Sequence, residues 1–166
     1  MKVGLLTDSD RGARGEYEDR SGPLMAELIA KNTRWTIARQ AVIPDDLGGI
    51  ADTLQLWSDE GQLNLILTSG GTGFAPRDVT PEATLAVIQR SAPGIAEALR
   101  AESLKVTPHA MLSRGVAGIR GRTLIINLPG SPKAVRENMR VLLPVLPHAL
   151  ELLTDTPGSE MGHRRI

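Results

Sequence analysis

Hydrophobic positions along the chain follow two alternating patterns. Short apolar runs at 2–7, 63–67 and 123–127 are typical of buried strands, and 35–43 alternates weakly between polar and apolar residues. Between these runs, apolar residues recur every three or four positions, which is the spacing of one helix face. Strands that alternate with helices predict a parallel sheet covered on both faces. We therefore expect an α/β protein: a single three-layer α/β/α domain with a mostly parallel sheet over 1–154, followed by a flexible tail at 155–166.

Local capping signals predict where several helices begin. Thr80 is followed by a proline and an acidic residue, so we expect Thr80 to cap a helix that runs to about Arg90. Asp46 and Ser131 are the expected caps of two further helices, because each is a short polar residue in front of an apolar stripe. The remaining expected elements are a helix beginning at Ser21, a helix over 95–104, an edge strand or hairpin within 111–121, and a last helix ending near Leu153.

Composition narrows the function classes. The 166 residues carry 19 basic and 19 acidic side chains, so no overall charge favours nucleic acid or an anionic membrane as a partner. Two Trp, one Tyr and one Phe leave few platforms for stacking single-stranded nucleic acid. The absence of cysteine excludes disulfides, thiolate metal sites and a cysteine nucleophile. No apolar run approaches the roughly 18 residues of a membrane span, and the N-terminal residues lack a signal-peptide pattern. We expect a cytoplasmic protein with no nucleic-acid and no membrane partner.

A glycine-rich turn follows the apolar run at 63–67. Its residues are Ser69, Gly70, Gly71, Thr72 and Gly73. Glycines permit positive φ and let a ligand approach the main chain closely. Successive exposed N–H groups in such a turn bind an anion, most often a phosphate. Arg77 and Asp78 form a charged pair just beyond it. The alternative is a turn that only links strand to helix, but three glycines in four positions favour a ligand site.

Four loops follow expected strands at their carboxyl ends, namely 7–19, 45–46, 69–78 and 128–133. In an open parallel sheet these ends converge on one crevice. The crevice would hold the carboxylates of Asp45 and Asp78, the cation of Lys133 and the helix start at Ser131, with Ser113 as a further candidate for the anion site. Mg²⁺ takes oxygen ligands and bridges carboxylates to phosphates, so this set suits a phosphate ligand with Mg²⁺. Phosphoryl or nucleotidyl transfer and simple nucleotide binding both remain open. A solvated surface loop is equally consistent with 7–19.

Several motifs, in order along the chain, resemble the molybdopterin adenylyltransferase family, which includes bacterial enzymes of molybdenum cofactor biosynthesis and the G domain of gephyrin. The central motif is SGGTGFAPRDVTPEAT at 69–84. The others are SDRGARGEYEDRSGP at 9–23, PDD at 44–46, LSRGVAGIRG at 112–121 and NLPGSPKAV at 127–135. Together they span nearly the whole chain, which makes the resemblance specific for the superfamily.

The resemblance implies the fold of molybdenum cofactor biosynthesis proteins, a substrate and a reaction. Members of the family bind molybdopterin, a pterin with a dithiolene and a phosphate. They use Mg²⁺ and ATP to adenylylate that phosphate and release pyrophosphate. They are typically homotrimers, and transient contact with the molybdenum-insertion enzyme is expected.

The same resemblance assigns roles by position. Asp45 and Asp78 match the two important acids of the family and are the expected catalytic residues and Mg²⁺ ligands. The expected substrate- and phosphate-binding residues are Ser69, Gly70, Gly71, Thr72, Gly73, Ser113, Ser131 and Lys133. The expected nucleotide-binding residues are Asp8, Ser9, Pro129 and Gly130.

Two functions fit these residues. The first is a molybdopterin adenylyltransferase. The second is a non-catalytic molybdopterin-binding paralogue or scaffold of the same family, which would bind the ligand without turnover. Because both Asp45 and Asp78 are present, the sequence favours the enzyme.

Overall fold

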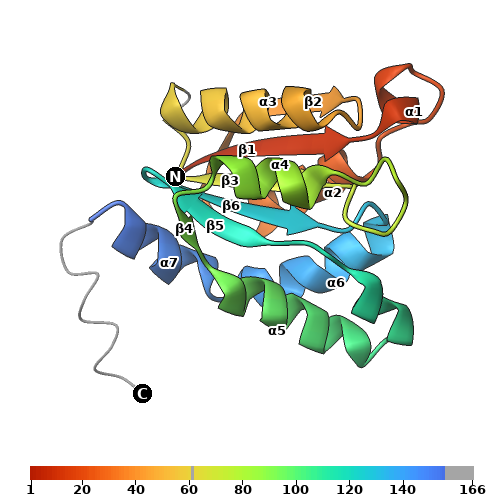
Figure 1. Ribbon diagram of the computed structural model, residues 1–166. Helices are drawn as coiled ribbons and strands as arrows, with labels where there is room; N and C mark the ends of the chain where they lie inside the picture. Colours follow the sequence, from red (N-terminus) through yellow and green to blue (C-terminus); the bar gives the residue numbers. More distant parts are fainter. Residues whose placement is uncertain (61, 156–166) are drawn as a thin grey trace.

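A six-stranded sheet runs through the middle of the computed structural model, which describes residues 1–60 and 62–155 (Figure 1). The strands lie side by side in the order β2-β1-β3-β6-β5-β4. Their bounds are β1 Lys2–Asp8, β2 Thr36–Ile43, β3 Leu65–Ser69, β4 Arg90–Ser91, β5 Ala117–Arg120 and β6 Thr123–Leu128. Apart from Asp155, the expected tail at 155–166 lies outside the described residues.

The pairing of the strands is parallel in the centre and antiparallel at one edge. β1 pairs in parallel with both β2 and β3, and β3 pairs in parallel with β6. β5 runs antiparallel to β6, and the two-residue β4 runs antiparallel to β5. The mostly parallel α/β fold expected from the sequence is therefore confirmed.

Helices cover both faces of the sheet (Figure 1). Their bounds are α1 Asp10–Ala13, α2 Ser21–Asn32, α3 Leu47–Asp59, α4 Thr80–Val87, α5 Pro93–Leu104, the 3₁₀ helix η1 Pro108–Leu112, α6 Pro132–Leu142 and α7 Leu146–Leu153. Alternate residues of the central strands point to opposite faces, so they form two cores. Leu5 and Leu67 pack in the core that contains buried residues of α2, α5, α6 and α7. Leu6 and Ile66 pack in the core under α3 and α4.

Sequence-based boundaries were wrong in three places. The strand expected at 63–67 is β3 at Leu65–Ser69, so it includes Ser69, which was expected in the turn. Thr80 does not cap α4: Val79 occupies that position, and Thr80 is the first residue of the helix. The helix ends at Val87 rather than near Arg90, because Arg90 and Ser91 pair with β5. The segment 111–121 combines the end of η1 with β5, which forms a hairpin with β6. The expected caps Asp46 and Ser131 are confirmed, since each side chain accepts a hydrogen bond from the backbone of its own first turn.

Among the described residues, no helix combines the length and the apolar character that a membrane crossing requires.

Candidate active site

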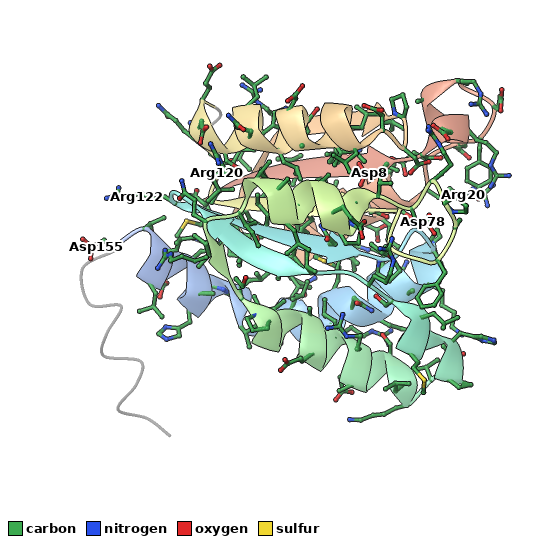
Figure 2. The ribbon with its side chains drawn as sticks, in the orientation of Figure 1. Asp8, Arg20, Asp78, Arg120, Arg122 and Asp155 are labelled. Atoms are coloured by element: carbon green, nitrogen blue, oxygen red, sulfur yellow. The ribbon has the colours of Figure 1, made fainter. Side chains whose placement is uncertain are left out.

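The sheet changes winding direction at the carboxyl ends of β1 and β3. The chain leaves β1 toward β2 at one edge, whereas β3 and β6 extend the sheet the other way. At such a switch point the loops diverge and leave a crevice in which ligands of open α/β sheets bind. Asp8 ends β1, and Ser69 ends β3. Figure 2 labels Asp8, Asp78 and Arg20 at this end of the sheet.

The glycine-rich turn packs tightly against this switch point. Gly70 and Gly71 have positive φ angles of 115° and 56°. A Cβ at Gly70 would lie 2.2 Å from the carbonyl oxygen of Asp8, and a Cβ at Gly71 would lie 2.1 Å from Oγ1 of Thr80. Both positions therefore require glycine for two reasons, the left-handed backbone and the absence of space. The positive φ angles that the glycines were expected to permit are therefore present at Gly70 and Gly71.

Asp8 is a buried acid under the turn. Its side chain is 3% exposed, and its carboxylate accepts a hydrogen bond of 3.1 Å from Oγ1 of Thr80. Its other carboxylate oxygen has no hydrogen-bond partner among the described residues. Burial raises the pKa of Asp8 well above its usual range, and the nearby Asp45 adds to this rise against the opposing hydrogen bond from Thr80. The Thr80 hydroxyl thus bonds to a residue distant in the sequence rather than to the first turn of its own helix.

Asp45 is held beside the turn by the loop after β1. The backbone N–H of Asp10 donates to the Asp45 carboxylate over 2.8 Å, and the N–H of Asp45 donates back to Asp10 over 3.1 Å. Burial raises the pKa of Asp45, and the negative charges of Asp10 and Asp78 raise it further. Asp46 caps α3, so the carboxylate of Asp45 does not serve as that cap.

The expected pair of Arg77 with Asp78 does not form. Arg77 donates two hydrogen bonds to Asp10, of 2.9 and 2.8 Å, and these hydrogen bonds lower the pKa of Asp10. Asp78 instead accepts a hydrogen bond of 2.9 Å from the backbone N–H of Ala75. The Asp10 partner lies 67 positions away in the sequence, so no local pattern indicates it.

Arg114 holds the glycine-rich turn from the other side. Its guanidinium donates to the carbonyl oxygen of Gly73 over 2.7 Å and also contacts the carbonyl of Asp78 and the side chain of Glu82. Its backbone N–H donates to the carbonyl of Thr72. Arg114 was not among the expected site residues, although it directly follows Ser113 in a motif that the sequence singles out.

The loop after β6 lies against the same turn. Gly130 packs on Gly70, since a Cβ on Gly130 would come within 3.3 Å of the Gly70 Cα. Ser69 donates a hydrogen bond of 3.0 Å to the carbonyl of Pro129. Ser131 caps α6 beside this contact. Lys133 lies in the first turn of α6, with a side chain that is 78% exposed.

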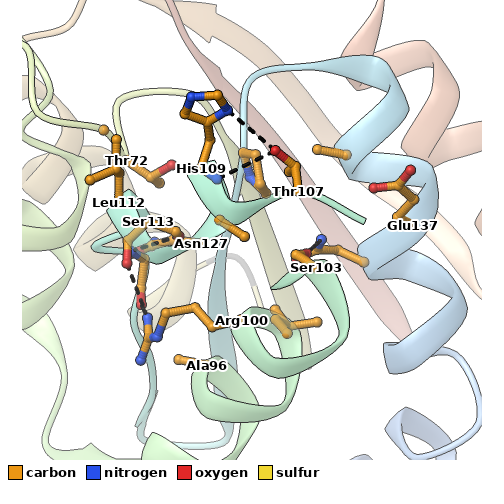
Figure 3. A pocket seen from close by; sticks show the side chains of 17 residues that line it. Thr72, Ala96, Arg100, Ser103, Thr107, His109, Leu112, Ser113, Asn127 and Glu137 are labelled. Carbon is orange, nitrogen blue, oxygen red and sulfur yellow. Dashed lines mark hydrogen bonds between the residues drawn. The ribbon is translucent and has the colours of Figure 1, made fainter. Parts of the chain in front are cut away.

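Two cavities border the glycine-rich turn. We call the first the α1–α2 cavity; it has a volume of about 430 Å³, and six of its lining residues belong to the expected site: Asp8, Ser9, Ser69, Gly70, Gly130 and Ser131. We call the second the α5–α6 cavity; it has a volume of about 270 Å³ and is shown in Figure 3. Four expected site residues line it: Thr72, Gly73, Ser113 and Pro129.

Four further expected residues, Gly71, Lys133, Asp45 and Asp78, lie outside the linings of both cavities. The two acids flank the turn that separates the cavities. One carboxylate oxygen of Asp45 would lie 3.4 Å from a Cβ on Gly71, and one of Asp78 would lie 2.8 Å from a Cβ on Gly73.

This arrangement fits a cation that is shared with a ligand. Within residues 1–60 and 62–155, no group of three or more His, Asp and Glu side chains gathers closely enough to hold a metal ion alone. Mg²⁺ usually takes one or two carboxylates and completes its shell with phosphate oxygens and water. Asp45 and Asp78 are two carboxylates beside the turn, a number that suits such a shared cation.

Comparisons with known proteins agree with this geometry. A family model described as "Probable molybdopterin binding domain" matches residues 4–148. The chain is 42% identical to a molybdopterin adenylyltransferase of Helicobacter pylori over 92% of this chain and 88% of that protein. It is 45% identical to a gephyrin of Dictyostelium discoideum over 98% of this chain, but it spans only about a quarter of the length of that relative.

A comparison with solved structures agrees with the similarity in sequence. The crystal structure of the molybdopterin biosynthesis enzyme MoaB from Thermus thermophilus has a TM-score of 0.88 and 52% identity, covering 94% of this chain and 98% of the other. The order of motifs, the fold and the switch-point site all point to one family, and the chain belongs to the molybdopterin-binding domain family.

Proposed function

We propose that this protein transfers the adenylyl group of ATP to the phosphate of molybdopterin and releases pyrophosphate. The observation that carries the proposal is the pair of cavities on one glycine-rich turn. Ser69 and Gly70 line the α1–α2 cavity, whereas Thr72 and Gly73 line the α5–α6 cavity. A reaction that joins two phosphorylated substrates needs two sites that share one anion-binding element, and this turn supplies it. The Helicobacter pylori relative named molybdopterin adenylyltransferase supports the choice of substrates.

The α1–α2 cavity suits the nucleotide. Arg11 and Arg20 line it together with the hydroxyl-bearing Ser9 and Ser21, and guanidinium groups bind phosphates well. Tyr17 also lines this cavity, with the guanidinium carbon of Arg11 lying 5.4 Å from its ring centre. The more apolar α5–α6 cavity is left for the pterin, with Thr72 and Ser113 beside its phosphate.

The proposed reaction needs positioning and charge neutralisation rather than an acid or base. An oxygen of the pterin phosphate attacks the α-phosphorus of ATP, the bond from that phosphorus to the bridging oxygen breaks, and pyrophosphate leaves with the bonding electrons. The attacking oxygen is already ionised, so no residue has to remove a proton from it. Asp45 and Asp78 would hold Mg²⁺, which supplies positive charge to the converging phosphates. The backbone N–H groups of the turn orient the attacking phosphate.

A pyrophosphate-release assay with molybdopterin, ATP and Mg²⁺ tests the proposal. We expect one pyrophosphate and one adenylylated pterin for each ATP consumed, and no pyrophosphate when the pterin is omitted. Binding of molybdopterin without pyrophosphate release would refute the proposed adenylyltransferase activity and identify a non-catalytic paralogue or scaffold. The isolated protein is the correct sample, because a separate partner is not needed for this reaction.

We propose further that the protein works in the cytoplasm as a homotrimer and passes its product to a molybdenum-insertion enzyme. The cysteine-free composition fits a reducing compartment. Exposed apolar side chains on η1 and near α7, including Met111 at 70% and Val145 at 52%, support a subunit contact. Multi-angle light scattering should give three times the mass of one 17.8 kDa chain. A stable monomer at micromolar concentration would contradict the trimer.

A further inference from the structure

One acidic side chain in the lining of the α5–α6 cavity makes no close contact that would account for its position there. Glu137 lies on α6 and lines this cavity, with a side chain that is 25% exposed. Its nearest ionic neighbour is Nζ of Lys133, at 4.0 Å, and Lys133 is itself largely exposed. Within the part of the chain that the structure describes, the Glu137 carboxylate accepts no hydrogen bond. An i,i+4 pair at this distance, with a largely exposed lysine, contributes little to stability.

Three other polar side chains of the cavity lining make hydrogen bonds within the protein. Asn138 donates to Ser103 over 3.1 Å, and this contact joins α6 to α5. Arg100 donates to the carbonyl of Gly115 over 2.8 Å and so holds the loop that carries Ser113. Asn127 on β6 donates to the hydroxyls of Thr68 and Thr84. Glu137 is therefore the charged acceptor in this wall that a ligand can reach.

The position of Glu137 indicates how a ligand would be oriented in the α5–α6 cavity. Figure 3 shows Thr72 and Ser113 on one side of the cavity and Glu137 on the other, at the α6 wall. The lining also contains the apolar residues Ala96 and Leu99, and Figure 3 shows Thr107 and His109 between its two sides. The cavity thus has hydroxyl groups and the glycine-rich turn on one side, a carboxylate on the other, and a lining that is partly apolar.

A phosphorylated pterin carries groups that match these two sides. Its phosphate lies at one end, its ring system in the middle and a 2-amino-4-oxopyrimidine edge at the other end. That edge presents two parallel donors, the ring N3–H and the 2-amino group, which match the two oxygens of one carboxylate. Resting on the function proposed above, we propose that Glu137 accepts both hydrogen bonds and selects a pterin ring over other flat phosphorylated rings.

Paired probes can test this selection. The first probe is pterin-6-ylmethyl phosphate, and the second is its lumazine counterpart, in which an oxo group replaces the 2-amino group. The oxo group removes one donor and points an acceptor at the carboxylate. We expect the wild-type protein to bind the pterin probe at least tenfold more tightly, since a lost hydrogen bond to a charged group typically costs a factor of about 10 to 150.

The variant Glu137→Gln should bring the two affinities to within about threefold, because an amide can donate to the oxo group. Glu97→Gln is the matched control: it makes the same chemical change on an exposed position of α5 that does not line the cavity. We expect Glu97→Gln to keep the preference of the wild type. Titration calorimetry measures all affinities, and the urea midpoint checks that both variants are folded.

The outcomes separate this inference from the proposed function. If Glu137→Gln keeps the wild-type preference, or if the wild type binds neither probe, the role of Glu137 is refuted. If the preference exists and disappears in Glu137→Gln while molybdopterin yields no pyrophosphate, Glu137 recognises the pterin but the transferase proposal fails. If both hold, Glu137→Gln should raise KM for molybdopterin about 10-fold or more and leave kcat nearly unchanged.

Discussion

Replacing Gly71 by alanine should destabilise the protein far more than the same replacement at Gly121. The two glycines have nearly equal φ angles, 56° and 55°. A Cβ at Gly121 would meet no atom within 4 Å, so Gly121→Ala measures the cost of the left-handed backbone alone, about 1–2 kcal/mol. A Cβ at Gly71 would lie 2.1 Å from the Thr80 hydroxyl.

Thr80 cannot easily move away from an added methyl group. It is fully buried and β-branched, and its hydroxyl bonds to Asp8. Displacing it adds overpacking, about 1–3 kcal/mol. It also leaves the buried Asp8 carboxyl without a partner, which costs roughly 1–3 kcal/mol more. We therefore expect Gly71→Ala to lose about 2–6 kcal/mol beyond the loss in Gly121→Ala.

Urea unfolding of both variants measures this difference, and a third variant tests its cause. Adding Thr80→Ala to Gly71→Ala removes the clashing oxygen, so the double variant should be more stable than the sum of the two single losses predicts. Equal losses for Gly71→Ala and Gly121→Ala would refute the reasoning. Strict additivity with Thr80→Ala would show that the turn relaxes in another way.

Three further predictions concern the acids of the site. Asp45→Ala should lower adenylyl transfer while the protein stays folded. Asp46→Ala should mainly lower the free energy of unfolding, by about 1 kcal/mol for a lost cap, as measured by urea unfolding; the reverse pattern would exchange their roles. Asp78→Asn keeps an acceptor for the Ala75 N–H but loses charge, so single-turnover transfer should fall roughly 10²-fold with pterin binding little changed; a wild-type transfer rate would remove Asp78 from the mechanism. Folding raises the pKa of Asp8 above its ordinary value of 3.8, so the folded protein holds this proton more tightly than the unfolded chain. The resulting stability is fully present below pH 3.8, and it is lost by about 1.4 kcal/mol per pH unit between 3.8 and the folded pKa. Asp8→Asn should lack this part of the decline in urea unfolding series from pH 4 upward, and parallel profiles would show that Asp8 does not titrate as inferred.

Local patterns in the sequence predicted what depends on neighbouring residues. Asp46 and Ser131 cap helices because a cap bonds to the backbone of its own first turn, which lies within three residues. A buried strand followed by a glycine-rich turn was also predicted, since apolar runs and glycines are local signals, although β3 lies two residues later than the expected 63–67.

Contacts between distant segments could not be predicted in this way. Thr80 has the sequence of a cap, but Asp8, 72 positions earlier, takes its hydroxyl. Arg77 stands next to Asp78 in the sequence, yet the backbone presents Asp10 to it. Charge and capping patterns give the residue type at a site, whereas the choice among partners depends on which loops the sheet brings together.

The shared turn also bears on how a product would leave. An adenylylated pterin would extend across the turn and occupy both cavities at once, because its two halves remain covalently joined. Two linked halves rebind one another's sites at high effective concentration, so the joined molecule stays longer than either substrate alone. Release of a reactive intermediate to bulk water then becomes slow, and a protein that receives it directly gains an advantage over free diffusion. A turn of three glycines in four positions would in this way act as a retention device as well as an anion site.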